Sequence, residues 1–520
     1  MNTITQGATA IAVALAPLLV AAAWLLVADR FGGGLPAAWA RRIAAAATVV
    51  SALGVGVAAW SRPEFDVEWI PVLGVRLDLA VDGISAPLIV MTALVGLIAV
   101  LLPHEAQEDP KALAITAPLA PGQPEPGVAT YYGCLVLVLF GAVLTFLARD
   151  AIVFFLGFEA VLVPMWVLIA RHGDAAEVAK RDGAAVRFLS VTAIGSMLML
   201  IGILVIATAT GSTDVDVWAD QGGAALSGQT QLAAAILLVI GLGLKVPIWP
   251  LHTWLPWVHA TAPTAGSVLL AAVLLKMGTY GLVRLVIPAV PEGFDDVAPV
   301  LAGCAAIGII WASLAALVES DLKRLIAWSS IAHLGFVALG LAAGTETGMQ
   351  AALFGNIAHG IISALLFVVV GGLKHRWGSA DLGVARAAVR EVAPRLGFGL
   401  VVGMAASLGL PGLAGFWGEI GAIYAAWVPA DTRNDGWFTL FAVMAALGAA
   451  VAAAYSVRVL RMVWAGERTR PVIADAAPVE RVAIAVLVAV IVGLGVYPLA
   501  LLDITGPAVA VLLASVGGAQ

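Results

Sequence analysis

Two lysines lie in an apolar stretch of the chain, residues 237–282. Lys245 and Lys276 are separated by a segment with four prolines between positions 247 and 263. A lysine at bilayer depth costs roughly 2.5–3.5 kcal/mol on insertion scales, and each proline in a spanning helix frees a carbonyl that needs another donor. A stretch with both penalties is expected to be buried among other helices beside water. We therefore predict that Lys245 and Lys276 are stations on a proton path.

Glu159 is the predicted partner of Lys245. It lies in the apolar run VFFLGFEAVLVPMW, where an unpaired carboxylate must take up a proton or find a cation. Each charge stabilises the other, so moving the carboxylate away favours release of the lysine proton. The alternative is a static ion pair that fixes helix packing. Lys276 has no carboxylate nearby in sequence, and its long apolar flank argues against the alternative that it reaches the interface.

Four histidines and one glutamate complete the set of candidate residues. His333 and His359 lie in apolar runs, and we predict that they pass protons between their ring nitrogens. A lone histidine in a helix is often a hydrogen-bonded core residue, and this alternative stays open for both. His252 and His259 lie near the prolines and are weaker candidates. Glu419 follows a second interruption, SLGLPG, and we predict that it ends the path.

Composition identifies a membrane protein. The chain has 520 residues, of which 62% are hydrophobic and 12% charged, and its mean hydropathy is +1.02. Apolar runs of about 20 residues recur along it, as in polytopic helical proteins. No basic patch predicts nucleic-acid binding, and no phosphate-binding loop or complete dinucleotide motif is present. Cys134 and Cys304 stand alone, and we predict no metal site and no cofactor in this chain.

The predicted fold is an all-α polytopic membrane protein with about fourteen spans. Their expected positions are 8–28, 42–60, 82–103, 129–148, 151–170, 187–208, 230–250, 261–288, 297–318, 323–343, 346–372, 396–425, 437–457 and 482–503. We read the first as an uncleaved helix and the tail after 503 as short. Residues 104–128 are predicted to form a Pro-rich linker, and the charged segment 374–395 a short helix on the membrane surface.

Two spans are predicted to be broken, at KVPIWP and at SLGLPG, each beside one intramembrane charge. The spacing predicts inverted five-helix repeats, spans 4–8 and 9–13, a transporter design. The expected segments are 1–128, 129–290, 291–465 and 466–520: a three-helix start with the linker, two repeats, and a last helix with the tail. Most lysines and arginines fall in odd-numbered loops, which places both termini on the non-cytoplasmic side.

Three motifs resemble the antiporter-like subunits of respiratory complex I, the proton-pumping NADH–quinone oxidoreductase. They are APTAGSV…LLKMGTYG, DLKRLIAWSSIAHLGF and SLGLPGLAGFWGE, and the resemblance covers about residues 70–500. Within that family the chain is most similar to the subunit M branch, equivalent to mitochondrial subunit 4. Glu419 stands where the sister subunits L and N usually have lysine, and the chain shows no long lateral helix of the kind that extends subunit L.

The resemblance implies a function. Glu159 and Lys245 resemble the coupled pair of the first half-channel, whereas Lys276, His333 and His359 resemble the central polar axis and Glu419 the exit residue. The implied role is proton translocation coupled to quinone reduction elsewhere in the complex, with flavin mononucleotide, iron–sulfur clusters and quinone in partner subunits. The implied partners are L-like and N-like subunits in the inner (plasma) membrane of a bacterium. The alternative is a subunit of a multi-subunit sodium/proton antiporter or a membrane-bound hydrogenase.

The chain departs from the family pattern at one surface. The family usually reads WLPDAHTEAPT where this chain reads WLPWVHATAPT. Trp257 therefore replaces an aspartate, and Thr261 stands where glutamate is usual. These changes remove the acidic groups expected there and leave the predicted membrane-centre residues untouched.

Overall fold

The computed structural model describes residues 2–31, 35–104, 127–174, 178–221, 223–382, 388–466 and 473–517. It is helical apart from one β-hairpin among these residues, which confirms the predicted all-α membrane class. Twelve described helices are long and apolar enough to cross a membrane. The count of about fourteen spans stays a prediction. The chain forms two compact units, one of residues 1–193 and 261–274 and the other of residues 194–260 and 275–520.

The first unit consists of helices around α5, with a hairpin after α2. Its elements are α1 (Asn2–Phe31), α2 (Ala37–Ser61), β1 (Glu64–Ile70), η1 (Pro71–Leu73), β2 (Val75–Ala80), α3 (Ser85–Leu101), α5 (Val128–Leu147), α6 (Ala151–Ala160), α7 (Leu162–His172), the start of α8 (Val178–Thr210), α12 (Thr264–Leu269) and η3 (Leu270–Leu274). Helix α5 packs against α1, α2, α3, α6 and α7. The hairpin, which the hydropathy pattern did not predict, carries an Arg76–Asp66 ion pair of 2.6 Å.

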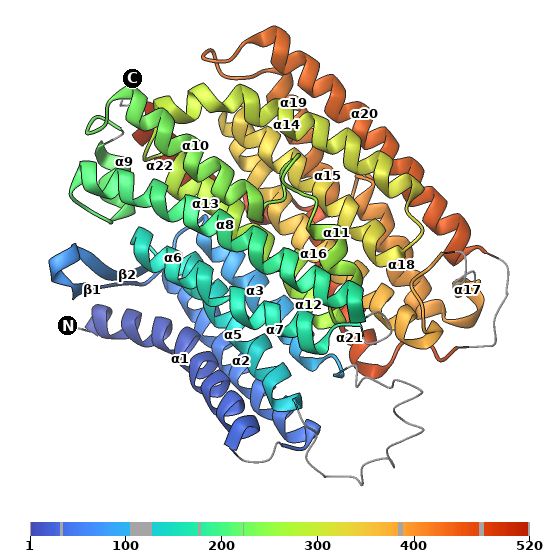
Figure 1. Ribbon diagram of the computed structural model, residues 1–520. Coiled ribbons are helices and arrows are strands. Elements are labelled where there is room, and N and C mark those ends of the chain that lie inside the picture. Colours follow the sequence, from blue (N-terminus) through green and yellow to red (C-terminus); the bar gives the residue numbers. More distant parts are fainter. Residues whose placement is uncertain are drawn as a thin grey trace. The chain divides into compact units, whose positions relative to one another are not determined.

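The second unit holds most of the candidate residues. Its elements are the rest of α8, α9 (Val215–Gln221), α10 (Gly228–Lys245), α11 (Leu255–Thr261), α13 (Leu275–Gly281), η4 (Leu282–Val286), α14 (Pro291–Val318), α15 (Leu322–Ala342), α16 (Glu346–Trp377), α17 (Val389–Val392), α18 (Pro394–Ser407), α19 (Ala414–Trp427), α20 (Asp435–Val459), η5 (Leu460–Trp464), α21 (Pro478–Val496) and α22 (Leu499–Gly517). Figure 1 shows α14, α15 and α16 side by side, and α15 and α16 are the most enclosed of these three.

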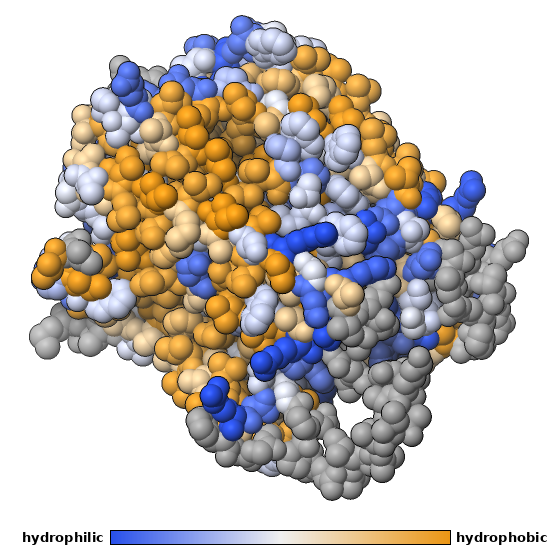
Figure 2. All heavy atoms as spheres, viewed as in Figure 1, coloured by the Kyte–Doolittle hydropathy of each residue, from blue (hydrophilic) through white to orange (hydrophobic). Residues whose placement is uncertain are grey.

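The lipid-facing character predicted from composition is visible on the surface. Much of the face in Figure 2 is apolar. Exposed aliphatic side chains of the second unit include Val300, Val318 and Leu447. These residues lie on α14 and α20, and about half or less of the apolar segment of each of these helices is buried. In α15 and α16 the corresponding share is 94%. The polar candidates on α15 and α16 are therefore far from lipid.

The observed helix ends can be compared with the predicted bounds of three segments. A single last span over 482–503 with a short tail was wrong, because α21 ends at Val496 and a further helix, α22, begins at Leu499. Pro498 explains the break, since proline lacks an N–H and disfavours helical geometry at the preceding residue. In the charged segment 374–395, α16 continues to Trp377 and the four-residue α17 follows. Most of the predicted linker, residues 105–126, lies outside the described residues.

Candidate functional site

The first predicted break is present between α10 and α11. Helix α10 ends on Lys245, which is only 2% exposed. The carbonyl of Leu244, left without a helical donor, accepts a 2.9 Å hydrogen bond from the indole nitrogen of Trp254. The amide of Ile248 turns back to the carbonyl of Gly243 at 3.0 Å. The break therefore supplies hydrogen-bond donors to these two carbonyls and places the side chain of Lys245 at a helix C-terminus.

Lys276 lies on α13, beside the end of α10. The side chain is fully buried, and π-helical segments η3 and η4 flank the helix. Gly278 allows the close approach, because a Cβ atom there would lie 3.4 Å from Cβ of Lys245 and 2.6 Å from Cγ2 of Val246. The two predicted lysines are thus carried by adjoining helices. Interrupted helical hydrogen bonding of this π type is frequent at functional sites.

Lys276 is bound by a histidine of α16. Its Nζ lies 2.5 Å from Nδ1 of His359. One turn before His359, the side-chain oxygen of Asn356 accepts a 3.0 Å hydrogen bond from the hydroxyl of Thr279. Two polar contacts therefore fix α13 against α16. The amine and the imidazole can each hold or release a proton, and the contact is short enough for direct transfer.

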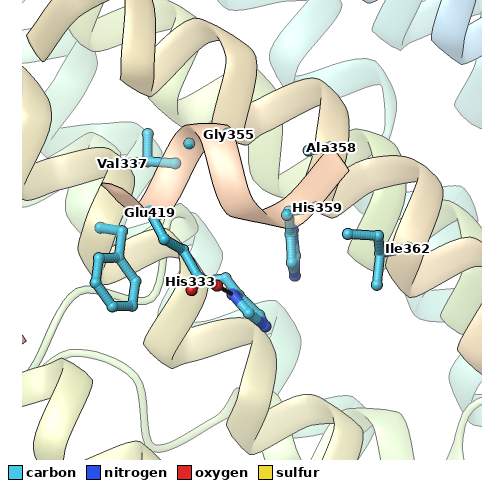
Figure 3. A pocket seen from close by; sticks show the side chains of 10 residues that line it. His333, Val337, Gly355, Ala358, His359, Ile362 and Glu419 are labelled. Carbon is cyan, nitrogen blue, oxygen red and sulfur yellow. Dashed lines mark ion pairs between the residues drawn. The ribbon is translucent and has the colours of Figure 1, made fainter. Parts of the chain in front are cut away.

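The polar line continues through His333 to Glu419, so that His359 precedes His333, the reverse of the order predicted from the sequence. The rings of His359 and His333 have centroids 5.5 Å apart, and Nδ1 of His333 lies 2.9 Å from Oε1 of Glu419. Figure 3 shows the three side chains facing one another across a small cavity. The cavity has a volume of about 20 Å³, enough for a single water molecule.

Glu419 is placed by the second predicted break. Helix α18 ends at Ser407 and α19 begins at Ala414, with Gly409 at φ +72° in the turn. A Cβ atom on Gly409 would lie 2.5 Å from Oε2 of Glu419. Glycine at position 409 therefore meets two requirements: it allows the left-handed backbone, and it leaves room for the carboxylate of Glu419.

Sequence reasoning missed two hydroxyl residues at this site. Ser407, the last residue of α18, has its Oγ 2.9 Å from Nε2 of His333. Tyr455 is fully buried on α20, a helix that packs against α18 and α19, and its hydroxyl has no hydrogen-bond partner among the described residues. Ser407 directly precedes the interruption SLGLPG, so its position beside a break was a usable signal. Tyr455 lies within an apolar span and gave none.

The remaining candidates lie elsewhere. His252 and His259 are buried and pack on aromatic rings, His252 on Trp328 and His259 on Phe367, with centroids 5.5 Å and 4.5 Å apart. Glu159 is the penultimate residue of α6 in the first unit and is partly exposed. Lys245 belongs to the second unit, so the Glu159–Lys245 pair stays a prediction. No described cluster of three or more His, Cys, Asp or Glu has the arrangement of a metal site.

Comparison with known proteins places these features in a family. Residues 148–447 match the family model described as NADH:quinone oxidoreductase/Mrp antiporter, transmembrane. The chain is 33% identical to NADH-quinone oxidoreductase subunit M of Rhodobacter capsulatus, covering 95% of this chain and 94% of the relative. It is 34% identical to an NAD(P)H-quinone oxidoreductase chain 4 of a Synechococcus strain, over 83% of this chain and 78% of the relative.

The fold is also known. A chain of respiratory complex I from Thermus thermophilus superposes with a TM-score of 0.82 at 24% identity, covering 97% of this chain and 99% of that one. At that identity the likeness concerns the fold alone. The helical fold of this chain therefore recurs in a chain of that complex.

Proposed function

This chain belongs to the NADH:quinone oxidoreductase/Mrp antiporter family, and from that membership we propose that the line from Lys276 to Glu419 carries the protons. The chain is an antiporter-like membrane subunit of the subunit M type, a part of the proton-translocating NADH–quinone oxidoreductase. The predicted family is confirmed. The observation that carries the residue-level proposal is the unbroken series Lys276, His359, His333 and Glu419 inside one helical unit.

Short contacts support proton transfer along this series. Lys276 is fully buried, so its ammonium form loses hydration, and its Nζ contacts the ring nitrogen Nδ1 of His359. His359 can accept the proton at Nδ1, and the cavity beside His333 has room for one water to bridge the rings. His333 then holds a direct contact with Glu419. Each neighbour is within one hydrogen bond, or one water, of the next.

The drive for this transfer is proposed to come from Glu159 and Lys245. Quinone reduction in partner subunits would shift that pair, and the loss of a nearby carboxylate favours proton release from Lys245. The close packing of Gly278 against Lys245 supports coupling from α10 to α13. In this proposal protons enter from the cytoplasm toward Lys245 or Lys276 and leave through Glu419. The two interrupted helices, read as inverted repeats, supply the hydrated places.

The assembly follows from the relatives. They are subunits of a multi-subunit oxidoreductase, and this chain is a multi-pass membrane protein. We propose that its neighbours are L-like and N-like subunits in a bacterial inner membrane, with flavin, iron–sulfur clusters and quinone held by other subunits and both termini non-cytoplasmic. A sodium/proton antiporter subunit is the second candidate, since the matching family also covers Mrp antiporters. Co-purification of flavin and iron–sulfur subunits distinguishes the two.

Replacement of Lys276 by methionine tests the residue-level proposal. Methionine keeps the length and packing but cannot carry a proton. In membrane vesicles with the assembled complex, we expect proton pumping driven by NADH to fall at least about tenfold, a barrier increase of about 1.4 kcal/mol. Lys180→Met is the matched control, because Lys180 lies exposed on α8. Unchanged pumping in Lys276→Met vesicles would refute the proposal.

A further inference from the structure

Helix α21 touches the backbone of the second break. Gly495 is buried near the end of this helix, and a Cβ atom there would lie 2.5 Å from the carbonyl carbon of Gly412 and still closer to Cα of Leu413. A side chain cannot approach another backbone so closely, so glycine is what permits this contact. Gly412 and Leu413 directly precede α19. The start of α19 therefore packs directly against α21.

A hydrogen bond joins the same two elements. The indole nitrogen of Trp417, the fourth residue of α19, donates to the carbonyl oxygen of Gly495 at 2.8 Å. Carbonyls in the last turn of a helix have no helical donor, and α21 ends one residue after Gly495. Trp417 therefore satisfies a carbonyl at the end of α21, and it lies two residues before Glu419. At the first break, by contrast, the indole of Trp254 donates to a carbonyl of α10, the helix that the break interrupts.

The start of α21 is anchored as well. The two terminal nitrogens of Arg376 donate to the two carboxylate oxygens of Glu480 at 2.9 and 2.6 Å, and such paired bonds fix both distance and orientation. Glu480 is the third residue of α21, and Arg376 is the penultimate residue of α16, the helix of His359. Just before α21, the carboxylate of Asp475 accepts from two backbone amides in the first turn of α18, each at 3.2 Å. The two ends of α21 are therefore bound to helices that carry or flank the polar line.

The helix of Glu419 also packs closely on α16. A Cβ atom on Gly418 would lie 2.6 Å from Cα of Gly355 in α16. Glu419 is the next residue, and its Oε1 lies 2.9 Å from Nδ1 of His333. Transfer between two groups depends steeply on their distance and alignment, so a small displacement of α19 is expected to slow it. Close backbone contacts with α16 and α21 therefore fix the helix on which this transfer depends.

We propose that α21 holds Glu419 in position for proton transfer, with Gly495 and Trp417 as the positioning residues. The inference rests on the proposed function of the line from Lys276 to Glu419. Neither residue gives or takes a proton in the transfer. Gly495 leaves room for the backbone of the break, and Trp417 ties the first turns of α19 to the end of α21. Together they keep the carboxylate of Glu419 in contact with His333.

Gly495→Ala is the central test, because its methyl group must displace the break or α21. In vesicles with the intact complex we expect NADH-driven pumping per assembled complex to fall about three- to tenfold. Gly493→Ala is the matched control: Gly493 lies two residues earlier on α21, and no described atom is within 4 Å of a Cβ atom placed there. Pumping in Gly493→Ala should equal that of the unmodified complex.

Trp417→Phe is a milder variant that keeps an aromatic ring and removes the N–H donor. We expect pumping per assembled complex to fall about twofold, since one hydrogen bond is lost. Trp427→Phe is its control, because Trp427 lies on the same helix with 55% of its surface exposed.

A second measurement reports on Glu419 itself. A hydrophobic carbodiimide modifies carboxyl groups, and mass spectrometry measures the modified share of Glu419 in the resting complex. We expect this share to rise about twofold or more in Gly495→Ala and Trp417→Phe, because a carboxyl group that loses its contact with His333 is freer to react. The two controls should leave it unchanged.

The two measurements separate this inference from the function on which it rests. A purely structural role for α21 predicts less assembled complex, with normal pumping and normal modification of Glu419 in what is assembled, and that result would overturn the inference. Lower pumping with unchanged modification would overturn it too, because α21 would then act elsewhere. If modification rises while pumping stays normal in Gly495→Ala, Trp417→Phe and Lys276→Met, the positioning of Glu419 by α21 stands and the proposed function fails.

Discussion

The two interrupted helices of the second unit carry opposite charges beside their breaks. Helix α10 ends on Lys245, whereas α19 begins at Ala414 and carries Glu419 in its second turn. The C-terminus of a helix has a partial negative charge and the N-terminus a partial positive one. Each ionisable side chain therefore matches the field of the half-helix on which it lies. Glu419 reaches back toward the break, where Gly409 leaves room for its carboxylate.

The two breaks present different backbone groups, so one architecture can hold either sign of charge inside a membrane. The end of α10 presents carbonyl oxygens, of which that of Leu244 already accepts the Trp254 indole. The start of α19 presents amide groups, and Glu419 also contacts His333 at 2.9 Å. The first break thus favours a proton donor and the second a proton acceptor. These fields stabilise the ammonium form of Lys245 and the carboxylate form of Glu419, and they do not themselves drive a proton from the first break to the second.

Reversing the charge at each break is expected to change proton pumping most, and it tests directly whether the helix ends set the sign of each charge. Lys245→Glu places a carboxylate beside carbonyl oxygens that cannot donate a hydrogen bond, so we expect pumping to fall roughly 100-fold, about 2.8 kcal/mol. Glu419→Lys should be milder, about tenfold or less, because a lysine amine can contact Nδ1 of His333 as Lys276 contacts His359. NADH-driven pumping in vesicles measures both.

Lys245→Arg is the control for the first reversal, since it keeps the positive charge at the helix end. We expect it to retain more pumping than Lys245→Glu in equal amounts of assembled complex. Equal losses in Lys245→Glu and Lys245→Arg would show that the sign of the charge at this break is not set by the helix end. The comparison of the two breaks would then be wrong.

A pair of glycines in the second break offers a finer test. Gly409 and Gly412 have φ of +72° and +90°, so alanine strains the backbone at either, by about 1–2 kcal/mol. Only at Gly409 would the new Cβ meet Glu419, whereas at Gly412 nothing lies within 4 Å. We expect both variants to lower the thermal midpoint of the complex similarly. Only Gly409→Ala should lower pumping, by about three- to tenfold, and equal pumping in the two variants would argue against a role for the carboxylate position.

The sequence predicted the breaks and the ionisable residues of the polar line, because prolines, glycines and intramembrane charges have local meanings, but it placed His333 before His359, the reverse of their order in the structure. Lys276, His359, His333 and Glu419 stood out as ionisable groups in apolar runs, and the structure brings them together. The contact of Ser407 with His333 joins α18 to α15, two segments far apart in the sequence, and no local pattern encodes it. The hairpin β1–β2 and helix α22 were not predicted, for different reasons. A short strand pair gives little signal in the hydropathy pattern, and Pro498 alone marks the break between α21 and α22 in a continuous apolar run.

The smallest expected effect concerns Trp257, on the half-helix that follows the first break. The family usually has aspartate there, and this chain instead places the Arg324 guanidinium 4.9 Å from the centre of the Trp257 ring. A cation–π contact at an exposed site is worth about 0.5–1 kcal/mol, close to an exposed ion pair. Trp257→Asp should therefore leave the thermal midpoint and the pumping rate within about twofold of the unmodified complex, while Trp257→Ala lowers only stability. A several-fold rise in pumping in Trp257→Asp would show that an acidic group at this surface feeds the first break, and that Lys245 works below its capacity in this chain.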